Sequence, residues 1–365
     1  MMTNGPTKTD VAVNEWAVDD GVMRLREWGT DTIRVLPLPP TNEWTVGASD
    51  TCALQLDDPS GRVSRLHARL VRDRTKWLLR DLGSKNGVRL DGARRTEIVL
   101  EPGVEIGIGG ITLIAESSRS VALRGFLARL LGWRSDRTEV VDHALRSIRM
   151  AATRRSALVL CGQGDLVPMA RSIHRHALGD DRPFVVCDPR RRPGKATVRS
   201  AENHDSGLRA LAAAAGGSLC VRSRRLPRDF SEVVTALRDP SSRVALVVCA
   251  HAPEECEPFL AAPIVVPPLS SREAELDRII TEYAEDAISE LGQLGGSRNS
   301  FPTVDREWVR THSASSLPDI EKATLRLVAI RESRNVSDAA ARLGMAPVSL
   351  SRWIGRRALP MELVP

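Results

Sequence analysis

The stretch with the clearest potential for chemistry is a glycine-containing segment that follows an apolar run. The run SALVLC is followed by GQGD at residues 162–165, and then by Leu166 and Val167. A P-loop needs a lysine and a hydroxyl residue here, because they bind the β- and γ-phosphates and magnesium. Both are absent, and the carboxylate of Asp165 repels phosphate. The sequence therefore predicts the scaffold of a nucleotide site without its catalytic groups.

Metal chemistry has one weak candidate. Cys249, His251 and Cys256 stand close together in CAHAPEEC, but a structural site needs four ligands and this group offers three. His174 and His176 are two residues apart on an expected helix, so they point in different directions. We therefore expect no metal and no cofactor.

Length and composition indicate an ordinary globular protein of two or three domains. The chain has 365 residues, 42% hydrophobic and 27% charged, with a net charge of +6 that suits a polyanionic partner. No basic leader with an apolar stretch and no run near ~18 apolar residues is present, so we expect a cytoplasmic protein with no membrane partner. The six cysteines form no CxxC pair, which indicates reduced, mostly buried thiols.

Residues 1–19 are expected to be a flexible tail, and residues 20–117 a β-sandwich. Short runs with a period of two, such as HARLVRD, KWLLRDL and ITLIAES, alternate with turn signals. The turns GSKNG and LDG place Gly87 and Gly92 where a positive φ is needed.

This module resembles a forkhead-associated (FHA) domain, through TVGASDTCALQLDDPSGRVSRLHARL, WLLRDLGSKNGVRLDG and LEPGVEIGIGGITL. The most specific match is Ser64 and His67 with Asn86 and Gly87. The resemblance implies that Ser64 donates to the phosphate of a phosphothreonine peptide, that Asn86 holds the peptide backbone, and that His67 is structural. The rim of the site would be formed by Arg65, Ser84 and Lys85.

One residue departs from the family pattern. Gly47 is followed by Ala48, where the family has the arginine that binds phosphate. Arg62 lies in an expected long loop just before Ser64, and we hypothesise that it replaces the missing guanidinium. The alternative is a sandwich that binds partners without phosphate specificity.

Residues 122–267 are expected to form an α/β domain with a mostly parallel sheet, and residues 268–312 a helical lid-like region. Apolar runs such as PFVVCD, GSLCVR and RVALVVCA alternate with helical patterns. The basic amphipathic segment SRSVALRGFLARLLGWRS is more typical of a helix packed on this domain than of one on a membrane surface.

This region resembles the AAA+ domain of sigma-54-dependent transcription activators. The segments that carry the resemblance are LLGWRSDRTEVVDHALRSIRMAATRRSALVLCGQGD, LVPMARSIHRHALGDDRPFVVCD, GGSLCVRSRRLPRDFSEVVTALRD and IVVPPLSSREAELDRIITEYAEDAI. Where the family has two carboxylates after a strand, this chain has Arg222, Ser223, Arg224 and Arg225, and Glu321 stands near the place of the nucleotide-sensing arginine. The loop GAFTGA is missing. We therefore expect no enzymatic activity. The basic run RRPGKATVR is most simply a solvated loop, with contact to nucleic acid as the alternative.

Residues 316–360 resemble the Fis-type helix-turn-helix that ends the same family. Ser337 is a possible N-cap, Gly344 lies in the turn, and Pro347 starts the second helix of NVSDAAARLGMAPVSLSRWIGRR. From Glu321 to Arg357 there are eight basic and three acidic residues, an excess of five.

In that geometry the second helix enters the major groove. We expect Val348, Ser349 and Arg352 near the bases and Ser351, Arg356 and Arg357 near the phosphates. Trp353 is expected to pack inward. The alternative is a helical dimerisation bundle.

These inferences combine into a bacterial DNA-binding transcriptional regulator with a phosphopeptide-sensing module and a catalytically dead AAA+-like domain. Its expected partners are double-stranded DNA, a phosphothreonine-containing protein and further copies of itself, as a homodimer or higher oligomer. The alternative is an FHA adaptor in Ser/Thr kinase signalling that does not bind DNA and whose helical end mediates assembly.

Overall fold

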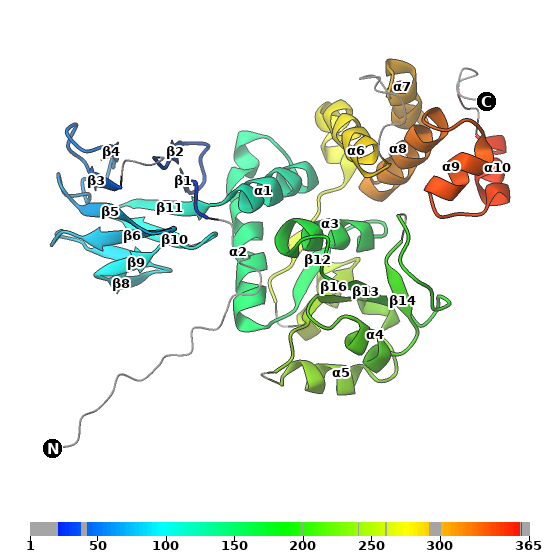
Figure 1. Cartoon of the computed structure of the whole chain (residues 1–365), viewed down its shortest axis with the longest axis horizontal. Coiled ribbons are helices and arrows are strands. Elements are labelled where there is room, and N and C mark those ends of the chain that lie inside the picture. Colours follow the sequence, from blue (N-terminus) through cyan, green and yellow to red (C-terminus); the bar gives the residue numbers. More distant parts are fainter. Residues whose placement is uncertain are drawn as a thin grey trace. The chain divides into compact units, whose positions relative to one another are not determined.

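The computed structural model describes residues 21–37, 42–198, 200–239, 241–259, 261–291, 301–357 and 359. The chain divides into two compact units, residues 1–122 with 148–156 and residues 123–147 with 157–365 (Figure 1). The tail predicted at residues 1–19 lies outside the described residues. Each unit is considered by itself below.

The first unit is a sandwich of two β-sheets. One sheet has the order β2-β1-β11-β10-β7-β8 and the other β4-β3-β5-β6-β9, and all strand pairs are antiparallel except β3 with β4. The strand bounds are Arg24–Glu27 (β1), Ile33–Val35 (β2), Glu43–Gly47 (β3), Leu54–Gln55 (β4), Ala68–Asp73 (β5), Lys76–Asp81 (β6), Val88–Leu90 (β7), Ala93–Arg95 (β8), Glu97–Val99 (β9), Glu105–Ile108 (β10) and Ile111–Glu116 (β11).

The period-two pattern builds the core of this sandwich. Leu70 on β5 is fully buried and pairs across the ladder with Leu79 on β6, while the intervening positions are more exposed. Gly87 and Gly92 have φ values of 71° and 84°, in the left-handed region that favours glycine. The predicted β-sandwich and both of its glycine turns are confirmed.

The second unit contains a six-stranded, fully parallel sheet in the order β14-β13-β15-β16-β12-β17 (Figure 1). Its strands are Leu158–Cys161 (β12), Phe184–Cys187 (β13), Glu202–His204 (β14), Ser218–Arg222 (β15), Ala245–Ala250 (β16) and Ile264–Val265 (β17). The helices among them are Val167–Leu178 (α3), Gly207–Ala213 (α4) and Phe230–Leu237 (α5). Every residue of β12 and β15 is buried, as expected for the inner strands of a parallel sheet. The predicted α/β domain is confirmed.

Seven further α-helices lie among the described residues. They are Ser118–Leu131 (α1), Thr138–Arg154 (α2), Leu276–Leu291 (α6), Thr303–His312 (α7), Leu317–Arg331 (α8), Val336–Arg342 (α9) and Pro347–Gly355 (α10). On α1, the apolar face predicted to pack inward is buried: Phe126 contacts the ring of His176, and Arg129 lies over the ring of Tyr283 on α6. The helical C-terminal region is therefore confirmed as a fold.

The backbone at Gly47 approaches the neighbouring loop too closely for any side chain. A Cβ atom there would lie 2.2 Å from the carbonyl oxygen of Arg65. We expect Gly47→Ala to lower the free energy of unfolding of the first unit by about 1–3 kcal/mol, because backbone must move. Urea unfolding checks this, with Gly21→Ala as the control, since nothing lies within 4 Å of its added Cβ. Equal stability of the two variants would contradict the close approach.

Candidate functional site

Three loops meet at one end of the β-sandwich. They follow β3 at Ala48, precede β5 at Ser64, and join β6 to β7 at Lys85 and Asn86. The backbone amide of Lys85 donates to the Ser64 hydroxyl at 3.2 Å, and the Asn86 side-chain amide donates to the Arg62 carbonyl at 2.7 Å. The structure thus brings the predicted Ser64 and Asn86 into one hydrogen-bonded group.

His67 holds two of these loops together from below. Its ring is fully buried, and its Nδ1 accepts from the Ser64 amide at 3.0 Å. Its Nε2 therefore carries the proton and donates to the Gly87 carbonyl, at 3.2 Å. This places His67 in a structural position, beneath the loops.

Ser84 also serves the loop. Its hydroxyl donates to the Asp81 carboxylate at 2.6 Å and accepts from the Gly87 amide at 2.9 Å. The side chain is buried, so it fixes the turn that presents Asn86. Arg65 and Lys85, the other predicted rim residues, are exposed.

The loop that carries Arg62 is organised by Asp58, which sequence reasoning missed. Its carboxylate accepts from the amides of Ser60, Arg62, Val63 and Gly110 at 2.8 to 3.1 Å. The side-chain hydrogen bond from Ser60 is the largest cause that lowers the pKa of Asp58 to about 2. The signal in the sequence is DDPSG, where an aspartate precedes turn-forming residues.

Position 48 lies beside the same group. The Ala48 amide donates to the Ser64 carbonyl at 3.0 Å, and its side chain is exposed. The Arg62 side chain is exposed as well. The backbone of Arg62 is held in place by hydrogen bonds with the side chains of Asp58 and Asn86. An arginine at either position extends from backbone that is hydrogen-bonded to the Ser64 loop.

The family comparison bears on this module. The FHA domain family model matches residues 44–109. Residues 44–109 form an FHA domain. No curated protein matches the chain.

Several solved structures are similar to this chain over about a quarter of its length. One comes from a structural and functional analysis of phosphothreonine-dependent FHA domain interactions, with 26% identity, 26% of this chain and 93% of that chain covered, and a TM-score of 0.23. The FhaA FHA domain, complexed with the intracellular domain of another protein, has 27% identity, 25% and 96% coverage, and a TM-score of 0.23. EmbR of Mycobacterium tuberculosis, in complex with a low-affinity phosphopeptide, has 26% identity, 26% and 24% coverage, and a TM-score of 0.24.

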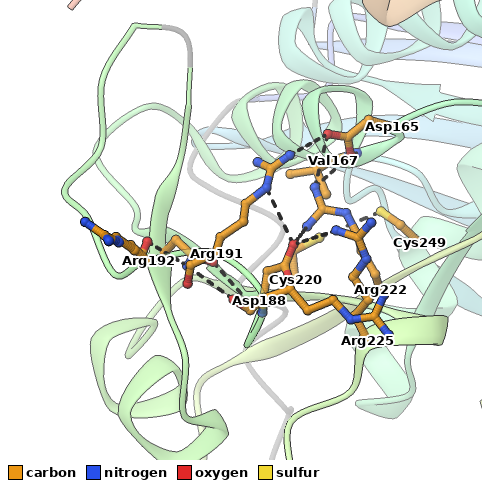
Figure 2. A network of polar contacts seen from close by, with 11 residues as sticks. Asp165, Val167, Asp188, Arg191, Arg192, Cys220, Arg222, Arg225 and Cys249 are labelled. Atoms are coloured by element: carbon orange, nitrogen blue, oxygen red, sulfur yellow. Dashed lines mark hydrogen bonds and ion pairs between the residues drawn. The ribbon is translucent and has the colours of Figure 1, made fainter. Parts of the chain in front are cut away.

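The second cluster of functional groups lies at the carboxyl edge of the parallel sheet (Figure 2). Asp165 follows β12, Asp188 follows β13, and Arg222 ends β15. Arg222 bridges the two acids, with its guanidinium 2.9 Å from Asp165 Oδ1 and 2.9 Å from Asp188 Oδ2. Ligands of open α/β sheets bind outside this edge, so the ion pair occupies the usual ligand position.

Two further arginines complete the charge balance around Asp188. Its carboxylate is fully buried, and Arg225 approaches it at 3.2 Å and Arg191 at 3.6 Å. Arg224 is engaged elsewhere, with its Nε 2.5 Å from Glu255 Oε1. Arg222 and Arg225, predicted to replace catalytic carboxylates, thus bind the protein's own acids.

The electrostatics of Asp165 follow from this pairing. Burial acts to raise the pKa of its carboxyl group, but the charge of Arg222 and the hydrogen bonds from it outweigh burial, and the net pKa is lowered. The carboxylate of Asp165 is therefore paired with arginine side chains inside the network. Leu166 and Val167 follow the loop at 162–165, where a P-loop has its lysine and its hydroxyl residue.

The third candidate site is the pair α9 and α10. Asn335 caps α9, with its side-chain oxygen accepting from the Asp338 amide at 2.9 Å, so the predicted cap at Ser337 is wrong. Asn335 is the residue with extended backbone geometry, whereas Ser337 already lies inside the helix. Gly344 has a φ of 59° in the turn, and Pro347 is in the first turn of α10, as predicted.

On α10, apolar and polar side chains separate cleanly. Leu350 and Trp353 are buried, and the guanidinium groups of Arg326 and Arg357 lie 5.0 and 5.1 Å from the centre of the Trp353 ring. The residues predicted to contact DNA are exposed, with Val348 67% exposed, and are Val348, Ser349, Ser351, Arg352, Arg356 and Arg357. Arg357 therefore stacks on the core tryptophan while remaining at the surface.

The described part of the chain contains neither a membrane-spanning helix nor a metal-binding cluster. None of its helices is both long and apolar enough to span a bilayer. No group of three His, Cys, Asp or Glu side chains within it is arranged to hold a metal ion. The six cysteines are unpaired and buried.

Because the pKa of Asp165 is lowered, we expect this carboxyl group to make the stability of the protein depend on pH. A carboxyl group whose pKa is lower in the folded state stabilises the protein above its unfolded pKa, near 3.8, and this contribution is lost as pH falls through the folded pKa. We therefore expect Asp165→Asn to destabilise the protein at pH 7 and to reduce the loss of stability below about pH 4.

Urea unfolding between pH 2.5 and 7 measures this, with Asp181→Asn at an exposed position as the control. Superimposable pH profiles for Asp165→Asn and the wild type would show that the ion pair with Arg222 adds no stability.

Proposed function

We propose that the protein is a DNA-binding transcriptional regulator whose FHA domain binds a phosphothreonine-containing protein and whose AAA+-like domain does not hydrolyse nucleotide. The phosphopeptide part rests on the FHA match and on relatives described as phosphothreonine-dependent or phosphopeptide-bound. The DNA part is carried by one observation, the exposed polar face of α10 opposite its buried Leu350 and Trp353.

The geometry of the FHA loops supports phosphate binding. A phosphate dianion is bound by hydroxyl and backbone donors together with a guanidinium group. The Ser64 hydroxyl and the exposed Lys85 and Arg65 lie on adjoining loops, and Asn86 is held beside them. Arg62 supplies the guanidinium that Ala48 lacks, from backbone fixed by Asp58.

The positions of two segments at the edge of the parallel sheet support the interpretation of this domain as AAA+-like. The loop that resembles a P-loop follows β12, in the interior of the strand order, and the segment that resembles the acidic catalytic motif follows β15, at the same edge. Arg222 and Asp165 stand with their charges exchanged relative to a nucleotide site, and they bind each other. Glu321, near the place of the sensing arginine, has a pKa that burial raises to about 7, and it offers no positive charge. We therefore propose a positioning scaffold with no cofactor and no enzymatic activity.

Sequence recognition by α10 requires more than one copy of the chain. A single short recognition helix reads few base pairs, and dimers place two such helices about one turn of DNA apart. We infer that the exposed Val348, Ser349 and Arg352 contact base edges and that the exposed Ser351, Arg356 and Arg357 contact phosphates. A homodimer or higher oligomer is therefore part of the proposal.

The phosphate site is tested with a degenerate phosphothreonine peptide library and the purified protein. We expect Ser64→Ala and Arg62→Ala each to weaken binding by about 1.5–3 kcal/mol, since each removes a hydrogen bond to a charged group. Ala48→Arg in the Arg62→Ala background is expected to restore affinity. The control is Arg34→Ala on β2, which changes the same charge away from the three loops.

The measurement is fluorescence anisotropy with matched phosphorylated and unphosphorylated peptides. Undiminished affinity of Arg62→Ala would show that Arg62 does not replace the missing arginine. Absence of any preference for the phosphorylated peptide would leave the module as a sandwich without phosphate specificity.

DNA binding is tested by selecting genomic fragments with the full-length protein and measuring anisotropy on the best fragment. We expect a two-fold symmetric site, and a loss of about 1–3 kcal/mol for Arg352→Ala with relaxed sequence preference. Arg334→Ala, an equal charge change on the exposed connection before α9, is the control and should keep the preference. Without enrichment of any sequence, the adaptor function replaces this proposal.

A further inference from the structure

The loop between β13 and β14 contains a segment that we call the arm, which consists of residues 189–198 and 200. Its chain folds back on itself through antiparallel bridges between Gly194 and Asn203 and between Thr197 and Ser200. The Asn203 side-chain amide donates to the carbonyls of Arg191 and Arg192, each at 3.3 Å, which fixes the base of the arm. Figure 2 shows Arg191 and Arg192, at the start of the arm, beside Asp188.

The tip of the arm lies against the turn between α9 and α10. A Cβ atom on Gly344, in that turn, would be 3.1 Å from Cβ of Thr197. Arg171 on α3 donates to the carbonyls of Thr197 and Val198 at 3.4 and 3.2 Å, so the tip is held in place from the other side. The arm therefore joins the charged sheet edge to the helix-turn-helix within the second unit.

The arm is strongly basic, and part of its positive charge is not neutralised by ion pairs among the described residues. Arg191 binds the acids of the sheet-edge network. Arg190 and Arg192 are exposed, and neither guanidinium pairs with a carboxylate among the described residues. Arg192 points away from the network in Figure 2, and Lys195 is 90% exposed although it lies 3.3 Å from Glu202.

We propose that the arm binds the phosphodiester backbone of DNA beside the site read by α10, through Arg190, Arg192 and Lys195. The proposal rests on the proposed DNA-binding function. In helix-turn-helix complexes the start of the second helix meets the base edges, so a segment held against the turn lies next to the duplex. Exposed cations there displace counterions from the phosphates and strengthen binding.

The test compares the wild type with the triple variant Arg190→Ala/Arg192→Ala/Lys195→Ala on the selected DNA fragment over a salt series. Each lost phosphate contact reduces the slope of log affinity against log salt by about 0.9, so we expect a slope smaller by up to ~2.7. The ratio of specific to nonspecific affinity should hold, because phosphate contacts carry no direct sequence information.

The control removes the same charge elsewhere in the α/β domain. Arg209 on α4, and Arg228 and Arg238 on either side of α5, are exposed, and Arg209→Ala/Arg228→Ala/Arg238→Ala should keep the wild-type slope. Thermal unfolding midpoints of both triple variants confirm that they fold. A second version with glutamine at the three arm positions removes the charge but keeps a polar side chain, and it should behave as the alanine variant does.

The possible outcomes distinguish a failure of the arm inference from a failure of the proposed function. If the wild type binds its site and Arg352→Ala weakens it, but the arm variant keeps the wild-type slope, the arm inference alone is overturned. Tighter binding by the arm variant also overturns it, and identifies the arm as a steric block. If the wild type selects no DNA sequence, the regulatory function and the arm inference fall together.

Discussion

The buried carboxylate of Asp188 is the constraint on which the α/β domain depends. A fully buried ion without partners costs several kcal/mol, so its position requires cations that converge on it. Arg222 arrives from β15, Arg225 from the turn after it, and Arg191 from the arm. One charge therefore fixes the relative positions of two strand ends and the start of the arm.

The FHA domain is organised by the same principle in a different chemical form. The carboxylate of Asp58 accepts hydrogen bonds from backbone amides instead of pairing with guanidinium groups. The ring of His67 links two loops, because it accepts one hydrogen bond and donates another. Groups fixed in this way are inside the loops, whereas the side chains of Arg62 and Lys85 stay at the surface. A rigid internal frame thus presents polar groups to a ligand without loss of their own hydrogen bonds.

The charges at the carboxyl edge of the sheet bear on the proposed role of the α/β domain as a scaffold that does not hydrolyse nucleotide. In a working site the cation and the acids are held apart by phosphate and magnesium. In this chain Asp165 and Arg222 form an ion pair with each other. The same edge then serves as the foundation of the arm, whose tip meets the turn at Gly344.

The sequence by itself determined the β-sandwich, the parallel α/β domain and the helical end, because alternation, continuous apolar runs and helical stripes are local patterns. For example, the apolar residue types of Leu70, Leu79 and strand β12 are enough to predict that these positions are buried. It also located Ser64, Asn86 and the exposed face of α10, since short motifs with fixed spacing carry them.

Only the tertiary structure decided that Asp58 organises the Arg62 loop, that Asn335 caps α9, that Asp165 pairs with Arg222, and that Thr197 touches Gly344. Apart from the Asn335 cap, where two neighbouring polar residues compete for one position, these contacts join residues far apart in the chain or backbone amides that every sequence has. Their partners are chosen by the folded geometry and leave no periodic signal in the sequence.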